Sequence, residues 1–186
     1  MRKLILVKHA KPEVVPDVPS ERWHLSQQGC DQCAPLAEQL AKHEPAVIVS
    51  STEPKAMETA ELLGARLNVQ QETGNDLFEH DRSNVPHMRN GEFISHVELF
   101  FRQPDELVLG LESANEAEAR FRAAVDAILT KHTGGNVAIV SHGTVIALFL
   151  AQDAKERFRL WRQLGLPSFA VLSLPDYKLL ETVERI

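Results

Sequence analysis

Leu4-Ile5-Leu6-Val7-Lys8-His9-Ala10 is the stretch that decides the fold. Four consecutive branched apolar residues between charged neighbours are typical of a strand that is buried on both faces, as in a parallel sheet. A second stretch, Val137-Ala138-Ile139-Val140-Ser141-His142-Gly143, follows the same pattern of four apolar residues, a polar residue, a histidine and a small residue. We therefore predict two buried strands, each of which ends in a histidine followed by a small residue.

The rest of the chain alternates between strand-like and helical patterns. Residues 46–50 form another buried strand, residues 69–71 are expected to add a short one, and residues 168–174 and 178–183 flank a turn and indicate a C-terminal hairpin. Apolar residues at i, i+3 and i+4 predict helices, which fall at about residues 26–41, 52–67, 93–102, 113–133, 144–151 and 155–164. This order predicts an α/β fold, a three-layer α/β/α sandwich with a mainly parallel central sheet.

Capping residues indicate where three of these helices begin. Ser26 is a candidate N-cap for the first helix, and Ser51 or Thr52 for the second, which has Pro54 in its first turn. Ser113-Ala114-Asn115-Glu116 has the form of a capping box.

Length and composition narrow the class of protein. The chain has 186 residues, of which 44% are hydrophobic and 25% charged, so we expect one domain, residues 1–186, with one core. The net charge of −6 argues against a nucleic-acid-binding surface. The apolar run after Met1-Arg2-Lys3 is too short for a signal peptide, and no run approaches the roughly 18 residues that span a bilayer. We expect a cytoplasmic protein with neither nucleic acid nor membrane as partner.

Cys30 and Cys33 form a C-x-x-C pair, for which a redox or metal role is an alternative. No second C-x-x-C follows, and both cysteines fall on one predicted helix. We interpret Cys33 as a small buried hydrophobic residue beside a more exposed Cys30. No metal and no cofactor are expected.

Unusual residues follow three of the predicted strands. Lys8 and His9 end the first, Ser50-Ser51-Thr52 ends the second and is followed by Lys55, and His142 ends the later one. Open parallel sheets bind ligands at the carboxyl ends of their strands. Two histidines and two lysines are therefore expected at one edge of the sheet, beside the N–H groups of helix N-termini.

Such a cluster suits phosphoryl chemistry. A neutral imidazole is a nucleophile, cations offset the charge of a phosphoryl group, and an acid must protonate the leaving oxygen. Glu79 and Asp81 in the polar loop 72–91 are the candidate acids. A lone histidine at a strand end is usually a simple polar cap, but two of them, at His9 and His142, favour a function.

Five short motifs in this order resemble those of the histidine phosphatase superfamily, also called phosphoglycerate-mutase-like. The family's Arg-His-Gly corresponds to Lys8-His9-Ala10, and its Leu-x-Glu to Leu77-Phe78-Glu79. Its Val-Ser-His-Gly is intact at residues 140–143. The remaining two motifs are Leu-Thr-x-x-Gly-x-x-Gln-Ala-x-x-Leu-Ala-x-x-Leu and Ser-Ser-x-x-x-Arg-Ala-x-x-Thr-Ala. Their counterparts lie at residues 25–40 and 50–60. The resemblance runs from residue 4 to about residue 174.

The resemblance implies a role for each matching residue. His9 would be the nucleophile that forms a phosphohistidine, and His142 would bind the phosphoryl group. Lys8 and Lys55 occupy the two phosphate-clamping positions. Glu79 would be the proton donor, with Asp81 as the alternative. The implied partner is a small phosphorylated substrate or a phosphate ion.

Three departures from the family pattern matter. Lysine replaces arginine at positions 8 and 55, which keeps the charge but loses the planar fork that matches phosphate. Ala10 stands where the family has glycine. Pro12-Glu13-Val14-Val15 stands where mutases have Glu-Thr-x-x-Asn, which argues against a glycolytic mutase.

Three functions remain open. The first is a phosphatase that hydrolyses a phosphomonoester through phospho-His9, with Lys8, Lys55 and His142 binding the phosphoryl group and Glu79 donating the proton. The second is a weak or inactive family member that binds a phosphate ligand or another protein. The third is a mutase that moves phosphate within a sugar acid.

The region 72–104 is expected to determine specificity. Arg82, His87 and Arg89 are candidates for contact with an anionic substrate. Phe93, Phe100 and Phe101 either belong to the core or form an exposed patch that pairs two chains as a homodimer.

Overall fold

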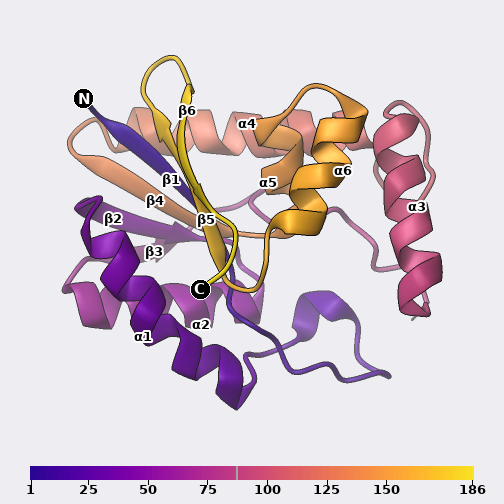
Figure 1. The fold of residues 1–186 in the computed structure, drawn as a ribbon, viewed down its shortest axis with the longest axis horizontal. Helices are drawn as coiled ribbons and strands as arrows, with labels where there is room; N and C mark the ends of the chain where they lie inside the picture. The colour runs from indigo at the N-terminus through magenta and orange to yellow at the C-terminus, as the bar shows by residue number, and fades with distance from the viewer. Residues whose placement is uncertain (87) are drawn as a thin grey trace.

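The computed structural model describes residues 1–86 and 88–186, so His87 lies outside the described residues. Six strands form one sheet in the order β3-β2-β4-β1-β5-β6 (Figure 1). Their bounds are β1 Lys3–Lys8, β2 Pro45–Ser50, β3 Gln71–Thr73, β4 Asn136–Ser141, β5 Ser168–Ser173 and β6 Leu179–Val183. The strands β3, β2, β4 and β1 are parallel, whereas β5 is antiparallel to β1 and β6 to β5.

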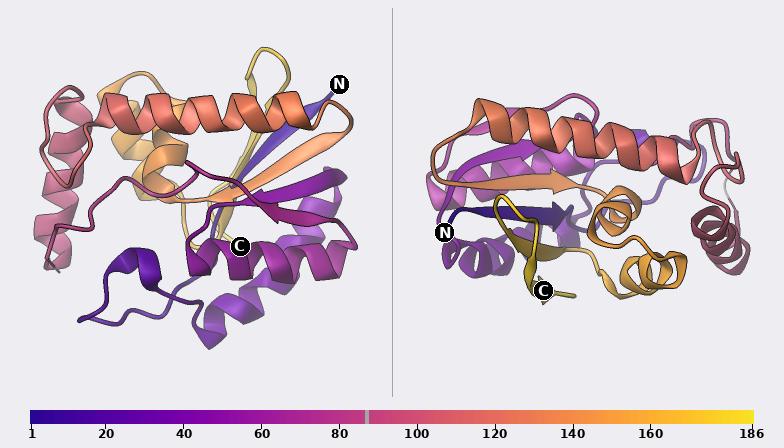
Figure 2. Two further views of the ribbon diagram at one scale, coloured as in Figure 1. Left: turned by 180° about the vertical axis from the view of Figure 1, so that it is seen from behind. Right: turned by 90° about the horizontal axis from the view of Figure 1, so that it is seen from above.

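Helices cover both faces of this sheet. Their bounds are α1 Gln27–Ala41, α2 Pro54–Leu67, α3 Asn90–Arg102, α4 Ala114–Lys131, α5 Gly143–Leu150 and α6 Ala154–Gln163, and a short 3-10 helix spans Ser20–Arg22. In the view from behind, α4 lies on one side of the sheet and α1 and α2 on the other (Figure 2). The predicted three-layer α/β/α fold with a mainly parallel sheet is confirmed.

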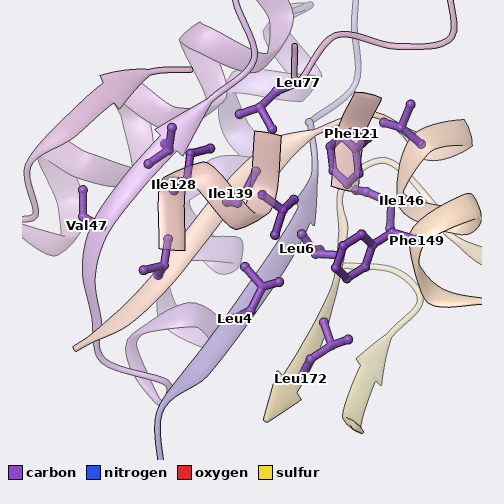
Figure 3. Close-up of a cluster of buried hydrophobic side chains, with 14 of the residues drawn as sticks. Leu4, Leu6, Val47, Leu77, Phe121, Ile128, Ile139, Ile146, Phe149 and Leu172 are labelled. Atoms are coloured by element: carbon purple, nitrogen blue, oxygen red, sulfur yellow. The ribbon is translucent and has the colours of Figure 1, made fainter. Parts of the chain in front are cut away.

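The pleat of β1 divides its apolar residues between two cores. Leu4 and Leu6 pack with Phe121 of α4 and Phe149 of α5 (Figure 3). Residues of the opposite face, Ile5 and Val7 among them, pack against α1 and α2. Each buried side chain of this size stabilises the fold by roughly 1.5–3 kcal/mol. β1 is therefore held from both sides, and its carboxyl end is a rigid position for functional side chains.

Two of the three predicted helix starts are confirmed. The Ser26 hydroxyl accepts a hydrogen bond from Gly29 N (3.1 Å), and Ser113 forms a complete capping box with Glu116. The prediction that Ser51 or Thr52 caps the second helix is wrong, because α2 begins at Pro54.

The local contacts explain this correction. Proline at the first helical position supplies a fitting φ and lacks an N–H that would need a cap. The Ser51 hydroxyl contacts His142 instead. The short strand predicted at 69–71 lies at β3, two residues later, because Asn68 ends α2 in the left-handed conformation.

The aromatic residues of α3 are core residues. Phe100 and Phe101 are fully buried, and Phe93 packs partly buried against the same cluster, which includes residues of α5 and α6. The alternative of an exposed Phe93-Phe100-Phe101 patch is wrong. Cys33 is buried, Cys30 is partly exposed, and both thiols are free. No helix in the described part of the chain is long and apolar enough to cross a membrane.

Candidate active site

His9 and His142 lie side by side at the carboxyl edge of the sheet. β1 and β4 pair in parallel with Lys8 opposite Ser141, and His9 N continues the ladder by donating to Ser141 O (3.0 Å). The two imidazole centroids are 5.1 Å apart, edge to face. The parallel register of the two strands thus brings together histidines that are 133 positions apart in the sequence.

One hydrogen bond determines which nitrogen of His9 is available. His9 Nδ1 lies 2.7 Å from Ala10 O, and because a carbonyl only accepts, Nδ1 carries the proton. The lone pair is therefore on Nε2. Burial lowers the pKa of His9 well below its usual value, and the neighbouring His142 and Lys55 lower it further. His9 is a neutral imidazole with a free Nε2 lone pair, which is the form that a nucleophile needs.

His142 is completely buried beside it. Its Nε2 lies 2.9 Å from Ser51 Oγ and 3.3 Å from Glu53 Oε1. Burial, and secondly the charge of Lys55, lower the pKa of His142 to about 3. Its Nδ1 is buried without a hydrogen-bond partner among the described residues. A buried polar atom of this kind is costly unless a ligand satisfies it.

Both lysines are held by backbone carbonyls. Lys55 Nζ donates to Ser20 O (2.7 Å) and forms an ion pair with Glu53. Lys8 Nζ donates to Leu164 O (2.7 Å). Burial lowers the pKa of Lys8 to about 8, partly offset by the negative charge of Glu79. Each ammonium is present at the site, and each already has a partner.

Gly143 makes room for the Lys8 side chain. A Cβ at Gly143 would lie 3.0 Å from both Cε and Nζ of Lys8. A side chain at this position would require the end of Lys8 to shift by a few tenths of an ångström, so glycine suits the close approach of Lys8.

Glu79 sits at the N-terminus of α5. Its carboxylate accepts hydrogen bonds from the backbone N–H groups of His80 (2.9 Å), Thr144 (3.1 Å) and Val145 (3.3 Å). Burial raises the pKa of Glu79, but Arg82, His142 and these N–H groups outweigh it and bring the pKa to about 2. The side chain is therefore a carboxylate at neutral pH.

The carboxylate of Asp81, the alternative acid, has different hydrogen-bond partners from that of Glu79. Its Oδ1 accepts from Ser83 N (3.0 Å) and Ser83 Oγ (2.8 Å), which closes a local turn. The Glu79 carboxylate lies against the residues that follow His142. The hydrogen bonds of the Asp81 carboxylate remain within its own loop, while the Asp81 backbone N–H donates to Glu112. Arg120 supports that loop by donating to Asp76 O (2.9 Å) and Phe78 O (3.0 Å).

Glu53 is a site residue that sequence reasoning missed. It is buried, it accepts a hydrogen bond from Glu79 N (2.8 Å), and it contacts both His142 and Lys55. Burial raises its pKa, with Lys55 acting in the opposite direction. A glutamate just before a helix is usually a surface residue, so only its place between two motif residues, Ser51 and Lys55, could have indicated a role.

Two cavities adjoin at this end of the molecule. A cavity of about 340 Å³, here called the carboxylate cavity, is lined by Glu53 and Glu79 among others. A second cavity of about 440 Å³, here called the apolar cavity, is lined by residues from the ranges 14–23, 82–86 and 88–93. Ser20, Arg82 and Ser83 line both. Among the residues that the structure describes, no group of three or more His, Cys, Asp or Glu side chains is placed to hold a metal ion.

The fold of the chain superposes on those of known structures. Mycobacterial glucosyl-3-phosphoglycerate phosphatase superposes with a TM-score of 0.73 and 26% identity over 93% of this chain and 90% of that one, and it has also been solved with inorganic phosphate. Bacillus stearothermophilus YhfR gives 0.75 and 22% over 99% and 96%. Entamoeba histolytica phosphoserine phosphatase gives 0.71 and 18% over 98% and 97%.

No curated protein matches the chain by sequence. The family model of the histidine phosphatase superfamily (branch 1) matches residues 4–178, which includes all five motifs and both histidines of the site. The chain therefore belongs to the histidine phosphatase superfamily.

Proposed function

We propose that this protein is a phosphatase that hydrolyses a phosphomonoester through a phosphohistidine on His9, within one domain of residues 1–186. The observation that carries the proposal is the neutral His9 imidazole, with Nδ1–H held by Ala10 O and the Nε2 lone pair free. Membership of the superfamily and the names of its structural neighbours, phosphatases of a sugar-acid phosphate and of phosphoserine, support it.

The reaction proceeds in two steps. The bound phosphomonoester monoanion first transfers its proton to the Glu79 carboxylate. His9 Nε2 then attacks phosphorus, the bond between phosphorus and the ester oxygen breaks, and the leaving oxygen takes the proton from Glu79. Water then attacks the phosphohistidine, the P–N bond breaks, and the Glu79 carboxylate takes the proton from that water and passes it to the departing phosphate. The products are the free alcohol and inorganic phosphate, and the enzyme returns to its starting state. Asp81 is the alternative donor.

Lys8, Lys55 and His142 bind the phosphoryl group in this proposal. The ammonium charges of Lys8 and Lys55, together with an N–H of the neutral His142 imidazole, offset the charge of the phosphoryl oxygens. With the Ser51 hydroxyl donating to Nε2, the proton of neutral His142 is on the unpartnered Nδ1, which can donate to a phosphoryl oxygen. Lys55 must exchange part of its contact with Glu53 for the substrate, so binding competes with an internal ion pair.

That ion pair also favours a second candidate function. Lys55 is neutralised by Glu53, and both lysines donate to backbone carbonyls. Because both ammonium groups already have partners, less of their charge is available to stabilise the transition state of phosphoryl transfer. Such a site fits a family member that binds a phosphorylated ligand with little turnover.

The decisive experiment compares wild type with His9→Ala. Both are incubated with an aryl phosphate from acid to mildly alkaline pH, and acid-labile phosphate on the protein is measured after rapid quenching. Release of phosphate and labelling by wild type alone support the proposal. Equal inertness of the two proteins refutes it, and phosphate binding by calorimetry then tests the binding function. Transfer of phosphate to a second hydroxyl, without free phosphate, would instead indicate a mutase.

A further inference from the structure

The apolar cavity has walls suited to a hydrophobic group. Val14, Val18 and Trp23 line one side and Val85, Met88 and Phe93 the other. Most of the lining residues are apolar, and the polar ones are Asp17, Ser20, Arg82, Ser83 and Asn90. Its volume of about 440 Å³ is in the range of small-molecule sites. In Figure 1 the segment around the 3-10 helix and α3 lie at the same end of the molecule, beyond the carboxyl edge of the sheet.

Trp23 presents its ring to the cavity without offering a hydrogen bond. Its Nε1 donates to Val18 O (2.8 Å) and Val15 O (3.2 Å) within its own loop. The indole N–H is therefore satisfied, and the group that remains for a ligand is the apolar ring.

The phosphoryl-binding residues line neither cavity, but backbone contacts link Lys55 to residues that line the apolar cavity. Ser20 lines both cavities, and its carbonyl accepts the hydrogen bond from Lys55 Nζ. The Trp23 carbonyl accepts from Lys55 N (3.1 Å). A group esterified to a phosphoryl held near Lys55 is thus within reach of the apolar wall.

We propose that the apolar cavity holds the leaving group of the substrate, and that the substrate is a phosphomonoester of an aromatic or otherwise apolar alcohol. This rests on the proposed function. A sugar would bring several hydroxyls that lose their hydrogen bonds to water against such walls, which is costly. An aromatic ring gains from the burial of its surface and from contact with Trp23 and Phe93.

The test uses 2-phenylethyl phosphate and ethyl phosphate, whose leaving alcohols are of similar acidity, so that a difference reflects binding. We expect kcat/KM to be roughly tenfold or more higher for the phenylethyl ester. Trp23→Ala should abolish this preference. Val14→Ser should reduce it without affecting folding, because Val14 is 56% exposed. Leu99→Ser, at an exposed position of α3 outside the cavity, should leave it unchanged.

Equal kcat/KM for the two esters, or a preference that survives Trp23→Ala, overturns the proposal while leaving the proposed function intact. If neither ester is hydrolysed, the proposed function fails instead. Calorimetry with 2-phenylethylphosphonate and ethylphosphonate then still tests the cavity, because tighter binding of the phenylethyl compound requires no turnover, and equal binding refutes the proposal.

Arg82 supports a second inference from a different observation. It lines both cavities and lies over the Phe93 ring, with Cζ 4.9 Å from the centroid. Within residues 1–86 and 88–186, no hydrogen bond or ion pair engages its guanidinium. Its positive charge nonetheless lowers the pKa of both Glu79 and His142. Lys8 and Lys55, by contrast, already have hydrogen-bond partners.

We infer that Arg82 contacts the phosphoryl oxygens and supplies the planar guanidinium that Lys8 and Lys55 lack. Arginine offers two parallel N–H groups to a phosphoryl group, whereas lysine offers a point charge. To reach the phosphoryl oxygens, the Arg82 side chain must leave its place over the Phe93 ring. Because Arg82 is a loop residue, this movement requires no change in the fold.

Calorimetry with inorganic phosphate tests this inference without turnover. Arg82→Ala should weaken phosphate binding roughly tenfold or more, and Arg82→Lys should recover only part of the loss. Arg102→Ala, at an exposed arginine of α3 that lines neither cavity, is the control and should bind as wild type does. Unchanged phosphate affinity in Arg82→Ala overturns the inference, and so does full recovery by lysine.

Discussion

The Glu53 carboxylate is ion-paired with the Lys55 ammonium, and both side chains are more than nine-tenths buried. The pair places a carboxylate where the proposed function requires a cation to meet phosphate. Phosphate binding is therefore an exchange of one anion for another at Lys55. This relationship determines how the stability and the affinity of the protein should respond to mutation.

Glu53→Gln should destabilise the free protein but not the complex with phosphate. Removing the carboxylate leaves a buried ammonium without its counterion, which we expect to cost about 2 kcal/mol. Phosphate would then replace the lost charge, so its stabilising effect should be larger in the variant than in wild type. Thermal unfolding with and without phosphate measures both effects.

Glu156→Gln is the matched control, because Glu156 forms an ion pair with Arg159 on the exposed face of α6. It should change stability by less than about 0.5 kcal/mol. An equal response of the two variants to phosphate would contradict the assignment of Lys55 to the phosphoryl group.

Lys55→Arg should strengthen phosphate binding by roughly tenfold. A guanidinium can keep one N–H on Ser20 O and one on Glu53 while directing others at phosphate, whereas the ammonium has fewer donors to divide. Calorimetry with inorganic phosphate measures the change, and Lys131→Arg, at an exposed pair with Glu72, provides the control. A loss of affinity would show that the site is built around the smaller ammonium.

The sequence predicts those parts of the site that depend on strand ends. The run of branched residues before Lys8-His9 specifies a buried strand, and the same pattern before His142 specifies another. Because parallel strands end at one edge, the pattern alone places both imidazoles at that edge. Their contact depends on β1 and β4 being neighbours in the sheet, which the pattern does not specify. Most of the site residues that could be predicted therefore lie within residues 1–10 and 136–143.

Glu53 and the apolar cavity could not be predicted in this way. The burial of Glu53 depends on Glu79 N and His142, which belong to distant parts of the chain. The cavity brings Trp23 together with Phe93, and neither residue has a spacing that marks it. The prediction for Ser51 failed for the same reason. Its position before a helix suits an N-cap, but its hydroxyl contacts His142, which is distant in the sequence.

Phosphate affinity should fall as pH rises through about 8. Burial lowers the pKa of Lys8 to about 8, so this side chain is charged below that pH and neutral above it. Loss of the charge weakens attraction for a phosphoryl group. The pH profile of kcat/KM, which reports the free enzyme, should therefore decline on its alkaline side.

Lys8→Arg separates this effect from others, because arginine stays charged throughout this range. The decline near pH 8 should disappear in the variant, even if its absolute activity changes because a larger side chain must pack beside Gly143. A decline that persists unchanged would assign the titration to another group.

Glu79 starts the reaction without a proton, because its pKa in the free enzyme is about 2. The proton for the leaving oxygen must then arrive with the substrate, and the monoanion of a phosphomonoester, with a second pKa near about 6, can carry it. The negative charge of the bound phosphoryl group raises the pKa of Glu79 and allows the transfer. For an ester with a poor leaving group, kcat/KM should therefore increase as pH falls toward about 6.

Glu79→Gln should abolish that dependence. We expect a loss on the order of 10²–10⁴ in kcat for ethyl phosphate but a much smaller loss for 4-nitrophenyl phosphate, whose leaving group needs no proton. Asp81→Asn should affect both esters alike, because the Asp81 carboxylate is used within its own turn. If Asp81→Asn instead shows the selective loss and Glu79→Gln does not, the proton passes through Asp81, and the three N–H bonds to Glu79 serve to anchor α5.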